Sequence, residues 1–419
     1  MSRRITSIVW TAIVFVSFIG FQGMLTEEKK GEEVKEYTLE EQELDNDVIP
    51  VSKSDTIAEQ LQSLSLEQKI GQLFMVGIEG QTIDSVMKQY INDYYVGGFI
   101  LFKDNMESVE QTVSFINDLK KANEDQVPLF FSVDEEGGKV SRIPEQELVI
   151  APSAQEVGEK NDPELSFQIG RMLAKEVSAL GFNMNYAPVM DVNSNPENPI
   201  IGSRAYGSTP SQVVKNGIPV MQGHQYENVI PVIKHFPGHG DTSVDSHKQL
   251  PVVNKSLKQL QKIELKPFRR AIQENADAIM VAHLSIPKLD SKNPSSLSKK
   301  IMTDLLREKL HFRGVVITDD LTMKGITNDY SVSEAALQSF KAGSDILLIA
   351  HGKDNIVSSY ERIQHAVKTG EISEERLNES VYRILSLKSK YKVENNLVNP
   401  VDMKEMKEDM ERILSNFDS

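Results

Sequence analysis

Eight short apolar, β-prone runs recur along the chain, and longer amphipathic stretches separate them. Several of these runs show no alternation with polar residues, which is typical of parallel strands buried on both faces. Alternating strands and helices predict repeated βα units, and eight such units close an α/β barrel of about 250 residues or more. The strands are expected at residues 72–77, 97–102, 128–134, 182–191, 229–236, 278–284, 314–320 and 345–350.

The amphipathic stretches predict the outer helices of this barrel. The chain has 419 residues, 39% of them hydrophobic, which is enough to bury the core of one such domain. We therefore expect an α/β fold with a single (β/α)8 TIM-type barrel at 55–395, followed by a helical tail at 396–419. Helices are expected at 108–123, 165–181, 256–273, 332–343 and 373–392.

The first 26 residues predict a membrane segment. Residues 5–26 carry no charge and follow Arg3 and Arg4, which would lie on the cytoplasmic side. This run is near the roughly 20 residues that span a bilayer, is longer than the core of a typical signal peptide, and lacks a small-residue cleavage motif. We expect an uncleaved signal-anchor with an extracytoplasmic catalytic domain; cleavage would instead give a secreted protein.

Residues 27–54 predict an acidic linker. Between Glu27 and Asp47 there are ten acidic residues and three lysines, a net charge of −7 out of −15 for the whole chain. A segment with so few apolar residues is expected to be a solvated tether. The acidic balance disfavours a nucleic-acid partner, which usually requires a basic patch. Because the chain has no cysteine, disulfide bonds are excluded.

Polar side chains gather at the carboxyl ends of the expected strands, which is where an α/β barrel builds its active site. An aspartate at such a position also suits the N-cap of the next helix, so one aspartate alone decides little. Capping does not explain a lysine and two histidines. The residues are Asp134, Asp191, Lys234, His235, His283, Asp319 and Asp320.

The loop after the fifth strand, at 234–251, reads KHFPGHGDTSVDSHKQLP. Asp245 and His247 stand two residues apart on it, close enough for the carboxylate to hydrogen-bond the imidazole. Such a dyad is a candidate general acid/base, because histidine ordinarily titrates near neutral pH. In a rival interpretation His235, His239 and His247 bind a metal; the lysine before His235 and the lack of evident partners for the other ring nitrogens disfavour it.

The run KHFPGHGDTSVDSH resembles the signature of family 3 glycoside hydrolases of the β-N-acetylglucosaminidase branch. Other segments occur in the family's order and extend the resemblance over about residues 60–395. It implies a (β/α)8 barrel, hydrolysis of terminal β-linked N-acetylglucosamine with retention of configuration, and no cofactor. These segments are SLEQKIGQLFMVG, DEEGGKVSR, NYAPVMDV, NPIIGSRAYG, ELKPFRRAI and ITDDLTMKGI.

The resemblance also implies roles for individual residues. It makes Asp319 the nucleophile, with Asp320 more suited to brace the next helix. It gives the acid/base role to Asp245 and His247, where most retaining glycosidases use a second carboxylate. The implied sugar-binding residues, which suit hydroxyl and acetamido groups, are Asp134, Arg142, Arg204, Lys234 and His235.

Several of these positions have a second interpretation. Arg142 and Arg204 would also suit ion pairs that only stabilise the rim of the barrel. Lys139 stands where the family has an arginine, outside the implied binding residues, and we expect little effect from this change. His283 and Met323 are left out of the catalytic set, because a hydrogen-bonded rim histidine and a packing methionine explain them equally well.

The predicted enzyme is an exo-acting monomer whose carbohydrate substrates are muropeptides with a terminal N-acetylglucosamine. Phosphorolysis stays open as a second hypothesis, because a neutral imidazole does not repel an incoming phosphate. A non-catalytic cell-wall-binding protein would lack the nucleophile or the dyad, and both are present in the sequence. A β-glucosidase is disfavoured, because such family members usually take their acid/base from an added C-terminal domain.

Overall fold

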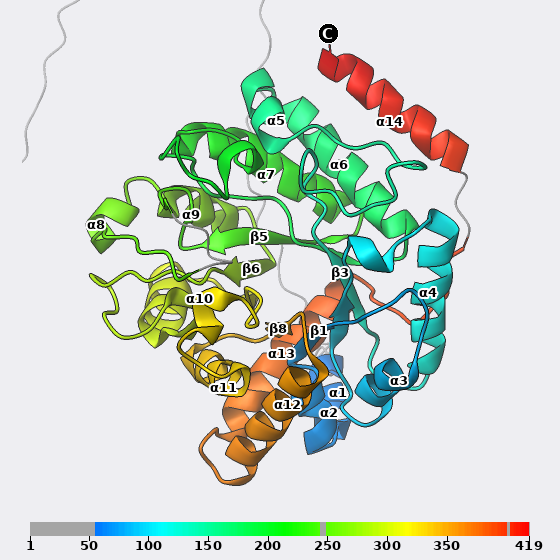
Figure 1. The fold of residues 1–419 in the computed structure, drawn as a ribbon, viewed down its shortest axis with the longest axis vertical. Coiled ribbons are helices and arrows are strands. Elements are labelled where there is room, and N and C mark those ends of the chain that lie inside the picture. The colour runs from blue at the N-terminus through cyan, green and yellow to red at the C-terminus, as the bar shows by residue number, and fades with distance from the viewer. Residues whose placement is uncertain (1–54, 244–248, 400–402, 419) are drawn as a thin grey trace, which may run out of the picture. The chain divides into compact units, whose positions relative to one another are not determined.

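Eight parallel strands stand at the centre of the structure, and helices surround them (Figure 1). The computed structural model describes residues 55–243, 249–399 and 403–418. The strands are β1 (Phe74–Gly77), β2 (Gly98–Ile100), β3 (Phe130–Val133), β4 (Met184–Asn185), β5 (Ile230–Phe236), β6 (Ala278–Val281), β7 (Val315–Thr318) and β8 (Leu347–Ile349).

The strands follow one another in chain order around the sheet, from β1 to β7, with β8 beside β1. The two end strands meet through a parallel bridge between Ile317 and Ile346. The amide of Thr318 donates to the carbonyl of Ile346 at 3.1 Å, and that of Leu321 donates to the carbonyl of Leu348 at 3.0 Å. The ring therefore closes, and the predicted (β/α)8 barrel is confirmed.

Each observed strand lies within a predicted one, and the largest difference is at β4. The sequence predicts a strand at 182–191, but regular pairing covers only Met184–Asn185. Pro188 lies in the middle of the predicted strand and has no N–H to donate to a neighbouring strand. Parallel pairing resumes as a single bridge between Val189 and Lys234. The regular ladder thus ends at Asn185, and only this isolated bridge lies between it and Asp191.

The outer helices cover the strands and include the five predicted regions. The predicted helix at 256–273 is two helices, because Pro267 cannot donate the bond that would continue α8 into α9. The helices are α1 (Thr56–Ser63), α2 (Leu66–Gly71), α3 (Ser85–Asn92), α4 (Val109–Ala122), α5 (Ala154–Lys160), α6 (Pro163–Ala179), α7 (Pro210–Tyr226), α8 (Leu257–Leu260), α9 (Leu265–Gln273), α10 (Lys324–Thr327), α11 (Val332–Ala342), α12 (Lys353–Lys368), α13 (Glu374–Lys390) and α14 (Met403–Asp418), with 3-10 helices η1 (Lys103–Asn105), η2 (Gly202–Arg204) and η3 (Ser295–Leu297) and a π-helix η4 (Lys300–Lys309).

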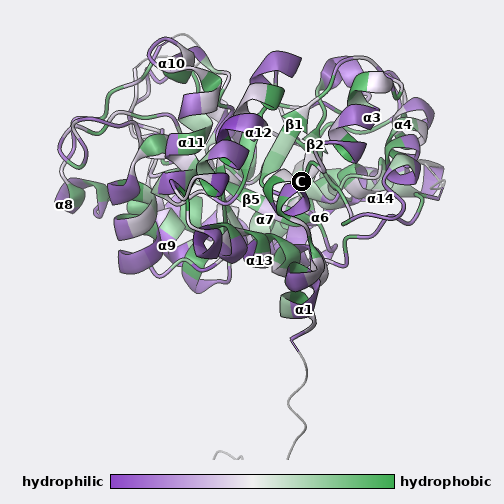
Figure 2. Ribbon diagram, turned by 90° about the horizontal axis from the view of Figure 1, so that it is seen from below, coloured by the Kyte–Doolittle hydropathy of each residue, from purple (hydrophilic) through white to green (hydrophobic). Residues whose placement is uncertain are grey.

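Helix α6 shows how local sequence and packing agree. The side chain of Asp162 caps its first turn by accepting from the amides of Glu164 and Leu165, and Pro163 occupies the first helical position, where no N–H is needed. Ile169, Met172 and Val177 face inward and are buried. Figure 2 shows the same division across the barrel, with hydrophobic residues concentrated in the strands and hydrophilic residues on the outer helices.

The predicted anchor at 1–26 and linker at 27–54 lie outside the described residues. Within the part of the chain that the structure describes, no helix is both long and apolar enough to cross a membrane. In the region of the expected tail, α14 packs against α6, and Lys175 lies 3.7 Å from Asp409 across that contact. The boundaries assigned to the domains from sequence stay a prediction.

Candidate active site

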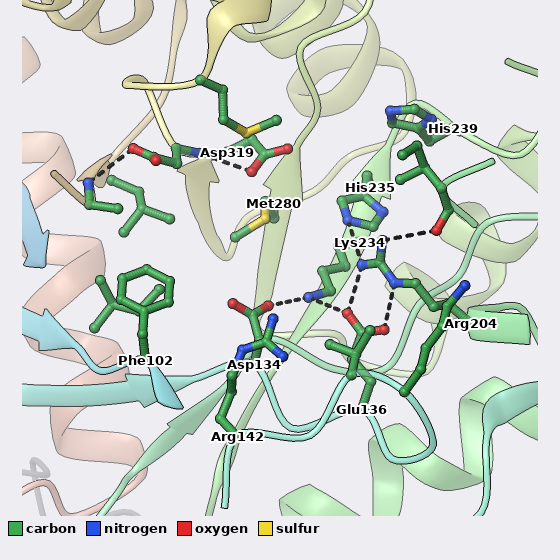
Figure 3. A pocket seen from close by; sticks show the side chains of 18 of the residues that line it. Phe102, Asp134, Glu136, Arg142, Arg204, Lys234, His235, His239, Met280 and Asp319 are labelled. Carbon is green, nitrogen blue, oxygen red and sulfur yellow. Dashed lines mark hydrogen bonds and ion pairs between the residues drawn. The ribbon is translucent and has the colours of Figure 1, made fainter. Parts of the chain in front are cut away.

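A pocket of about 400 Å³ opens at the carboxyl ends of the strands. Asp134 follows β3, Lys234 and His235 are part of β5, and Asp319 follows β7, so the barrel brings together residues up to 185 positions apart. Arg204, the last residue of η2, completes the polar side (Figure 3). The apolar lining includes Ile100, Phe102, Ile200, Met280, Met323 and Leu348.

The polar side of the pocket is a network of ion pairs around Lys234, which is buried. Its Nζ lies 2.5 Å from Oδ1 of Asp134 and 2.7 Å from Oε1 of Glu136. Glu136 also accepts two bonds from Arg204, at 2.7 Å from Nε and 2.7 Å from Nη2. Figure 3 shows these side chains pointing toward one another at the edge of the pocket. A two-pronged guanidinium–carboxylate contact fixes the orientation of both groups.

These charges stabilise one another in a largely dry site. Burial works against ionisation of Glu136, but Arg204 and Lys234 hold the pKa of this carboxyl well below its ordinary value. Burial likewise disfavours the charged form of Arg204, and Glu136 outweighs it and raises the pKa of the guanidinium. Glu136 and Arg204 therefore present fixed charges over the whole ordinary pH range.

His235 is held by a buried carboxylate. Its Nδ1 lies 2.6 Å from Oδ2 of Asp191, whose other oxygen accepts from the amide of His239 at 2.6 Å. Asp191 is fully buried; burial raises its pKa, but the neighbouring His235 and His239 outweigh this and lower it. The Nε2 of His235 faces Nη2 of Arg204 at 3.3 Å. The bond to Asp191 thus orients the ring with its second nitrogen toward the pocket.

Asp319 lies across the pocket from Lys234 (Figure 3). Burial works against its ionisation, yet the imidazoles of His283 and His235, the amide of Asp320 and the charge of Lys234 together keep the pKa of Asp319 below its ordinary value. The Asp320 amide donates to Oδ1 of Asp319 at 2.9 Å. An ionised carboxylate that is partly exposed and faces a cavity is suited to attack an electrophilic carbon.

The structure brings most of the predicted site residues into this one pocket. Its lining includes all five of the sugar-binding residues and the nucleophile implied by the resemblance. Asp245 and His247, the predicted acid/base dyad, lie outside the described residues. The catalytic and binding roles of all these residues stay predictions.

Arg142 and Arg204 differ in whether they form the ion pairs that the sequence also allowed at the rim of the barrel. Arg204 does pair with a carboxylate, Glu136, although it also lines the pocket. Among the described residues, the guanidinium of Arg142 has no carboxylate within ion-pairing distance, and its one bond is to the carbonyl of Ser141 at 3.3 Å. Arg142 therefore retains donors for a ligand.

The structure also places four residues that the sequence analysis left outside the catalytic and binding sets. Lys139, which is not among the implied binding residues and whose change from arginine we expected to have little effect, lines the pocket, and so does Met323. His283 is buried and bonded at both nitrogens, to Oγ of Ser296 at 2.6 Å and to the carbonyl of Asp320 at 2.9 Å, which agrees with a satisfied histidine. Asp320 braces the next turn, as predicted, by accepting from the amide of Thr322 at 3.0 Å.

Glu136 could not be assigned to the site from the sequence, and Asp191 was noted only as a polar residue at a strand end, without a role. Glu136 follows Asp134 at a spacing of two but pairs with residues 68 and 98 positions away. Asp191 is visible as a polar residue after an apolar run, yet its contact with His235 depends on the fold. No group of three or more His, Cys, Asp or Glu side chains suited to a metal occurs in residues 55–243, 249–399 and 403–418.

Comparison with known proteins decides the family. Residues 65–387 match the Glycosyl hydrolase family 3 N terminal domain, which is well over half of the chain. The chain belongs to glycosyl hydrolase family 3. Its similarity to several beta-hexosaminidases places it in the β-N-acetylhexosaminidase branch of that family, so the predicted family and enzyme class are confirmed.

Two curated relatives illustrate the extent of the match. The family 3 chain is 34% identical over 333 residues to Beta-hexosaminidase A of Pseudoalteromonas piscicida, covering 74% of this chain and 56% of that protein. It is 33% identical over 333 residues to Beta-hexosaminidase LpqI of Mycobacterium tuberculosis, covering 78% and 83%. This chain thus spans little more than half the length of the first relative.

Two solved structures share the barrel. One is a family 3 β-N-acetylglucosaminidase from Paenibacillus sp., with 38% identity, a TM-score of 0.81, and coverage of 84% of this chain and 68% of that one. The other is the β-glucoside phosphorylase BglX, with 28% identity, a TM-score of 0.78, and coverage of 86% and 66%. Solved structures similar to this barrel therefore include both a β-N-acetylglucosaminidase and a β-glucoside phosphorylase.

Proposed function

We propose that the protein is a retaining exo-β-N-acetylglucosaminidase that removes terminal N-acetylglucosamine from peptidoglycan fragments. The observation that carries this proposal is the placement of Asp319, with a pKa below its ordinary value, across one pocket from the Lys234 network. The names of the relatives support the sugar, since several are beta-hexosaminidases and one similar structure is a β-N-acetylglucosaminidase.

The Lys234 network suits the terminal sugar. Lys234 and Arg204 donate hydrogen bonds, Asp134 accepts them, and the Nε2 of His235 faces the same space. Hydroxyl groups both donate and accept, so a pyranose satisfies this mixture of groups. Because ion pairs and the Asp191 contact already fix the side chains, little reorganisation is needed when the sugar binds.

The reaction follows in two balanced steps. Asp319 attacks the anomeric carbon, the glycosidic bond breaks, and His247, assigned by the family resemblance, gives its proton to the leaving oxygen. This forms a glycosyl ester on Asp319. The same imidazole then takes a proton from water, whose oxygen attacks the anomeric carbon and releases Asp319. Two inversions at one carbon retain the β configuration.

Replacement of Asp319 by Asn tests the assignment of the nucleophile. The amide keeps the size of the side chain but cannot form the ester, so hydrolysis of an aryl β-N-acetylglucosaminide should fall by about four orders of magnitude. Asp329→Asn is the matched control, because Asp329 is exposed and lies ten residues further along the chain. Activity of Asp319→Asn within a few fold of the unmodified enzyme would remove Asp319 as the nucleophile.

Phosphorolysis is a second candidate, supported by the similarity to a β-glucoside phosphorylase. In that reaction phosphate takes the place of water in the second step and the product is the sugar 1-phosphate. Product analysis with and without added phosphate distinguishes the two. If the enzyme only hydrolyses its substrate, free N-acetylglucosamine should form at the same rate with and without added phosphate.

We also propose that residues 5–26 anchor an extracytoplasmic, monomeric catalytic domain to the membrane. The support is the uncharged run after Arg3 and Arg4. Full-length protein should fractionate with membranes and be released from intact spheroplasts by added protease. A chain that starts at Asp55 should be soluble, active and monomeric by light scattering. Cytosolic recovery of the full-length protein would contradict the anchor.

A further inference from the structure

A cluster of three charged residues links the two ends of segment 242–254, which contains the predicted acid/base dyad. Asp241 stands directly before this segment and Lys255 directly after it. Nζ of Lys255 lies 2.8 Å from Oδ2 of Asp241 and 2.5 Å from Oε1 of Glu264. One ammonium group therefore joins the two ends of the segment to each other and to a third part of the chain.

Glu264 is the fixed point of this cluster. Its side chain is only 1% exposed, and it stands directly before α9, which packs beside β5 (Figure 1). The ring of Phe268 on α9 meets that of Phe236 on β5 edge to face, with centroids 5.4 Å apart. The chain after β5 also packs on Glu264, because a Cβ at Gly238 would lie 2.5 Å from its Cβ. Gly238 has a φ of +125°, which favours glycine.

The first end of the segment is held by the chain that follows β4. The side-chain amide of Asn198 donates to the carbonyl of His239 at 2.9 Å, and that of Asn195 donates to the carbonyl of Thr242 at 3.2 Å. Asp241 lies between these two anchored residues. Because His239 lines the pocket, the position of this end is set relative to the pocket.

The second end is held by a different neighbour, the chain that follows β6. The amide of Val253 donates to the carbonyl of Ser285 at 2.8 Å, and the amide of Ser285 donates to the carbonyl of Pro251 at 2.9 Å. Different parts of the chain thus hold the two ends, and Lys255 supplies a direct link between them.

The charge of Lys255 is maintained by its two partners. Burial disfavours the ammonium form, but the bonds to Asp241 and Glu264 outweigh this and raise the pKa of Lys255. An ammonium group has three hydrogens and can serve both carboxylates at once. Loss of Asp241 would leave Lys255 paired with Glu264, so no buried charge would be left without a partner.

We propose that Lys255 is a positioning residue for the acid/base step. By binding Asp241 and Glu264 together, it fixes the separation of the two ends of segment 242–254. This restricts the positions from which His247 acts, and misplacement of a reacting group by about 1 Å can slow a reaction by about 10². Lys255 acts through His247, since it is not among the described residues that line the pocket. The effect on catalysis rests on the reaction proposed above; the link between the two ends does not.

Asp241→Ala tests the positioning role, because it releases the first end and keeps the Lys255–Glu264 pair. A dinitrophenyl β-N-acetylglucosaminide has a leaving oxygen that needs no proton, whereas the methyl glycoside requires one. In Asp241→Ala, kcat/KM should fall by about 10- to 100-fold on the methyl glycoside and by less than about threefold on the dinitrophenyl glycoside. Equal falls on both substrates, or no fall on the methyl glycoside, would overturn the positioning role.

Glu197→Ala is the matched control. Glu197 is an exposed carboxylate in the chain after β4, so this variant should keep the substrate ratio of the unmodified enzyme. Lys255→Arg retains a cation with several donors and should also keep that ratio, whereas Lys255→Met should lose it as Asp241→Ala does. If Lys255→Met does not fold, Asp241→Ala still decides. A selective loss of the same size in Glu197→Ala would overturn the proposal.

Hydrogen exchange tests the link without any substrate. The amides of residues 238–242 should exchange at least about fivefold faster in Asp241→Ala than in the unmodified protein, and at the same rate in Glu197→Ala. Equal exchange in Asp241→Ala and the unmodified protein would show that Lys255 does not hold the first end. An unmodified enzyme that hydrolyses neither glycoside would instead refute the proposed function, while hydrogen exchange still decides the link.

Discussion

Buried charges lie at both ends of the barrel, and the two ends use them differently. At the amino ends of the strands, Asp345 precedes β8 and is fully buried. Its oxygens accept from Arg307 at 2.5 Å, Arg383 at 2.9 Å, Oγ of Ser380 at 2.6 Å and the amide of Val316 at 2.9 Å. Four donors use most of the capacity of a carboxylate, so Asp345 joins helices to strands.

At the carboxyl ends the same kinds of group face a pocket. Lys234 has three donor hydrogens and uses two of them on Asp134 and Glu136. Arg142 has no carboxylate partner among the described residues and donates once, to a carbonyl. The comparison teaches that burial and charge do not distinguish a binding cluster from a structural one. What distinguishes a binding cluster is that some of its donors and acceptors are unused and face a cavity.

Among the variants that test this comparison, the largest effect is expected for Lys234→Met. Removal of this central cation should lower kcat/KM on an aryl β-N-acetylglucosaminide by about 10³, as for loss of a preorganised donor. The melting temperature should fall less than for Asp345→Asn, because Arg204 still neutralises Glu136 and the Asp134 carboxylate is partly exposed to water. Lys103→Met is the control, since Lys103 is exposed and pairs with Glu145 outside the pocket. If the activity of Lys234→Met fell only in proportion to the fraction of unfolded protein, Lys234 would be a structural residue like Asp345, and the two ends of the barrel would not differ.

Asp345→Asn should give the opposite result. It leaves Arg307 buried without its carboxylate, so urea unfolding should show a loss of about 3–5 kcal/mol, while kcat of the folded enzyme stays unchanged. Asp118→Asn removes a surface pair with Lys121 and should cost about 0.5 kcal/mol or less. A fall in kcat for the folded Asp345→Asn enzyme would show that this end also serves catalysis.

The smallest effect is expected for Lys388→Met, at the amino ends of the strands. Lys388 donates to Oε1 of Gln72 at 2.6 Å and to the carbonyl of Gly97 at 3.1 Å, and burial lowers its pKa from 10.5 to about 7. The unfolded chain binds this proton more tightly, so the contribution is present above the unfolded value and is lost as pH falls toward about 7.

Urea unfolding between about pH 7 and about pH 9 measures this contribution. Stability of the unmodified protein should rise relative to Lys388→Met by at most about 1.4 kcal/mol per pH unit. Parallel pH profiles would show that Lys388 remains charged in the folded protein. That outcome would make the amino ends of the strands resemble the pocket in tolerating an incompletely paired cation.

The sequence is a good guide to the barrel because its strands are unbroken apolar runs. All eight observed strands lie within the predicted ranges, and every strand residue is buried. The exceptions come from proline. Pro188 limits β4, and Pro267 divides one expected helix into two, because neither residue can donate a main-chain hydrogen bond. Periodicity of hydrophobic residues does not reveal these interruptions.

The site was predictable where a charged residue directly follows a strand, as Asp134 and Asp319 do. Glu136 and Asp191 were not assigned, because their importance comes from contacts with Arg204 and His235, which lie 68 and 44 positions away. Such contacts depend on how the loops fold back over the barrel. The dyad of Asp245 and His247 was predicted from its spacing on the loop and from the family resemblance, and it stays a prediction because both residues lie outside the described ranges.

The short fourth strand has a further consequence. A ladder that continued past Pro188 would hold the chain straight, with alternate side chains directed into and out of the barrel. Instead the backbone leaves the regular ladder, and Asp191 contacts the ring of His235 and the amide of His239. A redesign that extended the regular pairing of β4 would add main-chain hydrogen bonds, but it would remove the contacts by which Asp191 holds His235 and His239. The short strand β4 therefore leaves Asp191 free to hold His235, which lines the pocket.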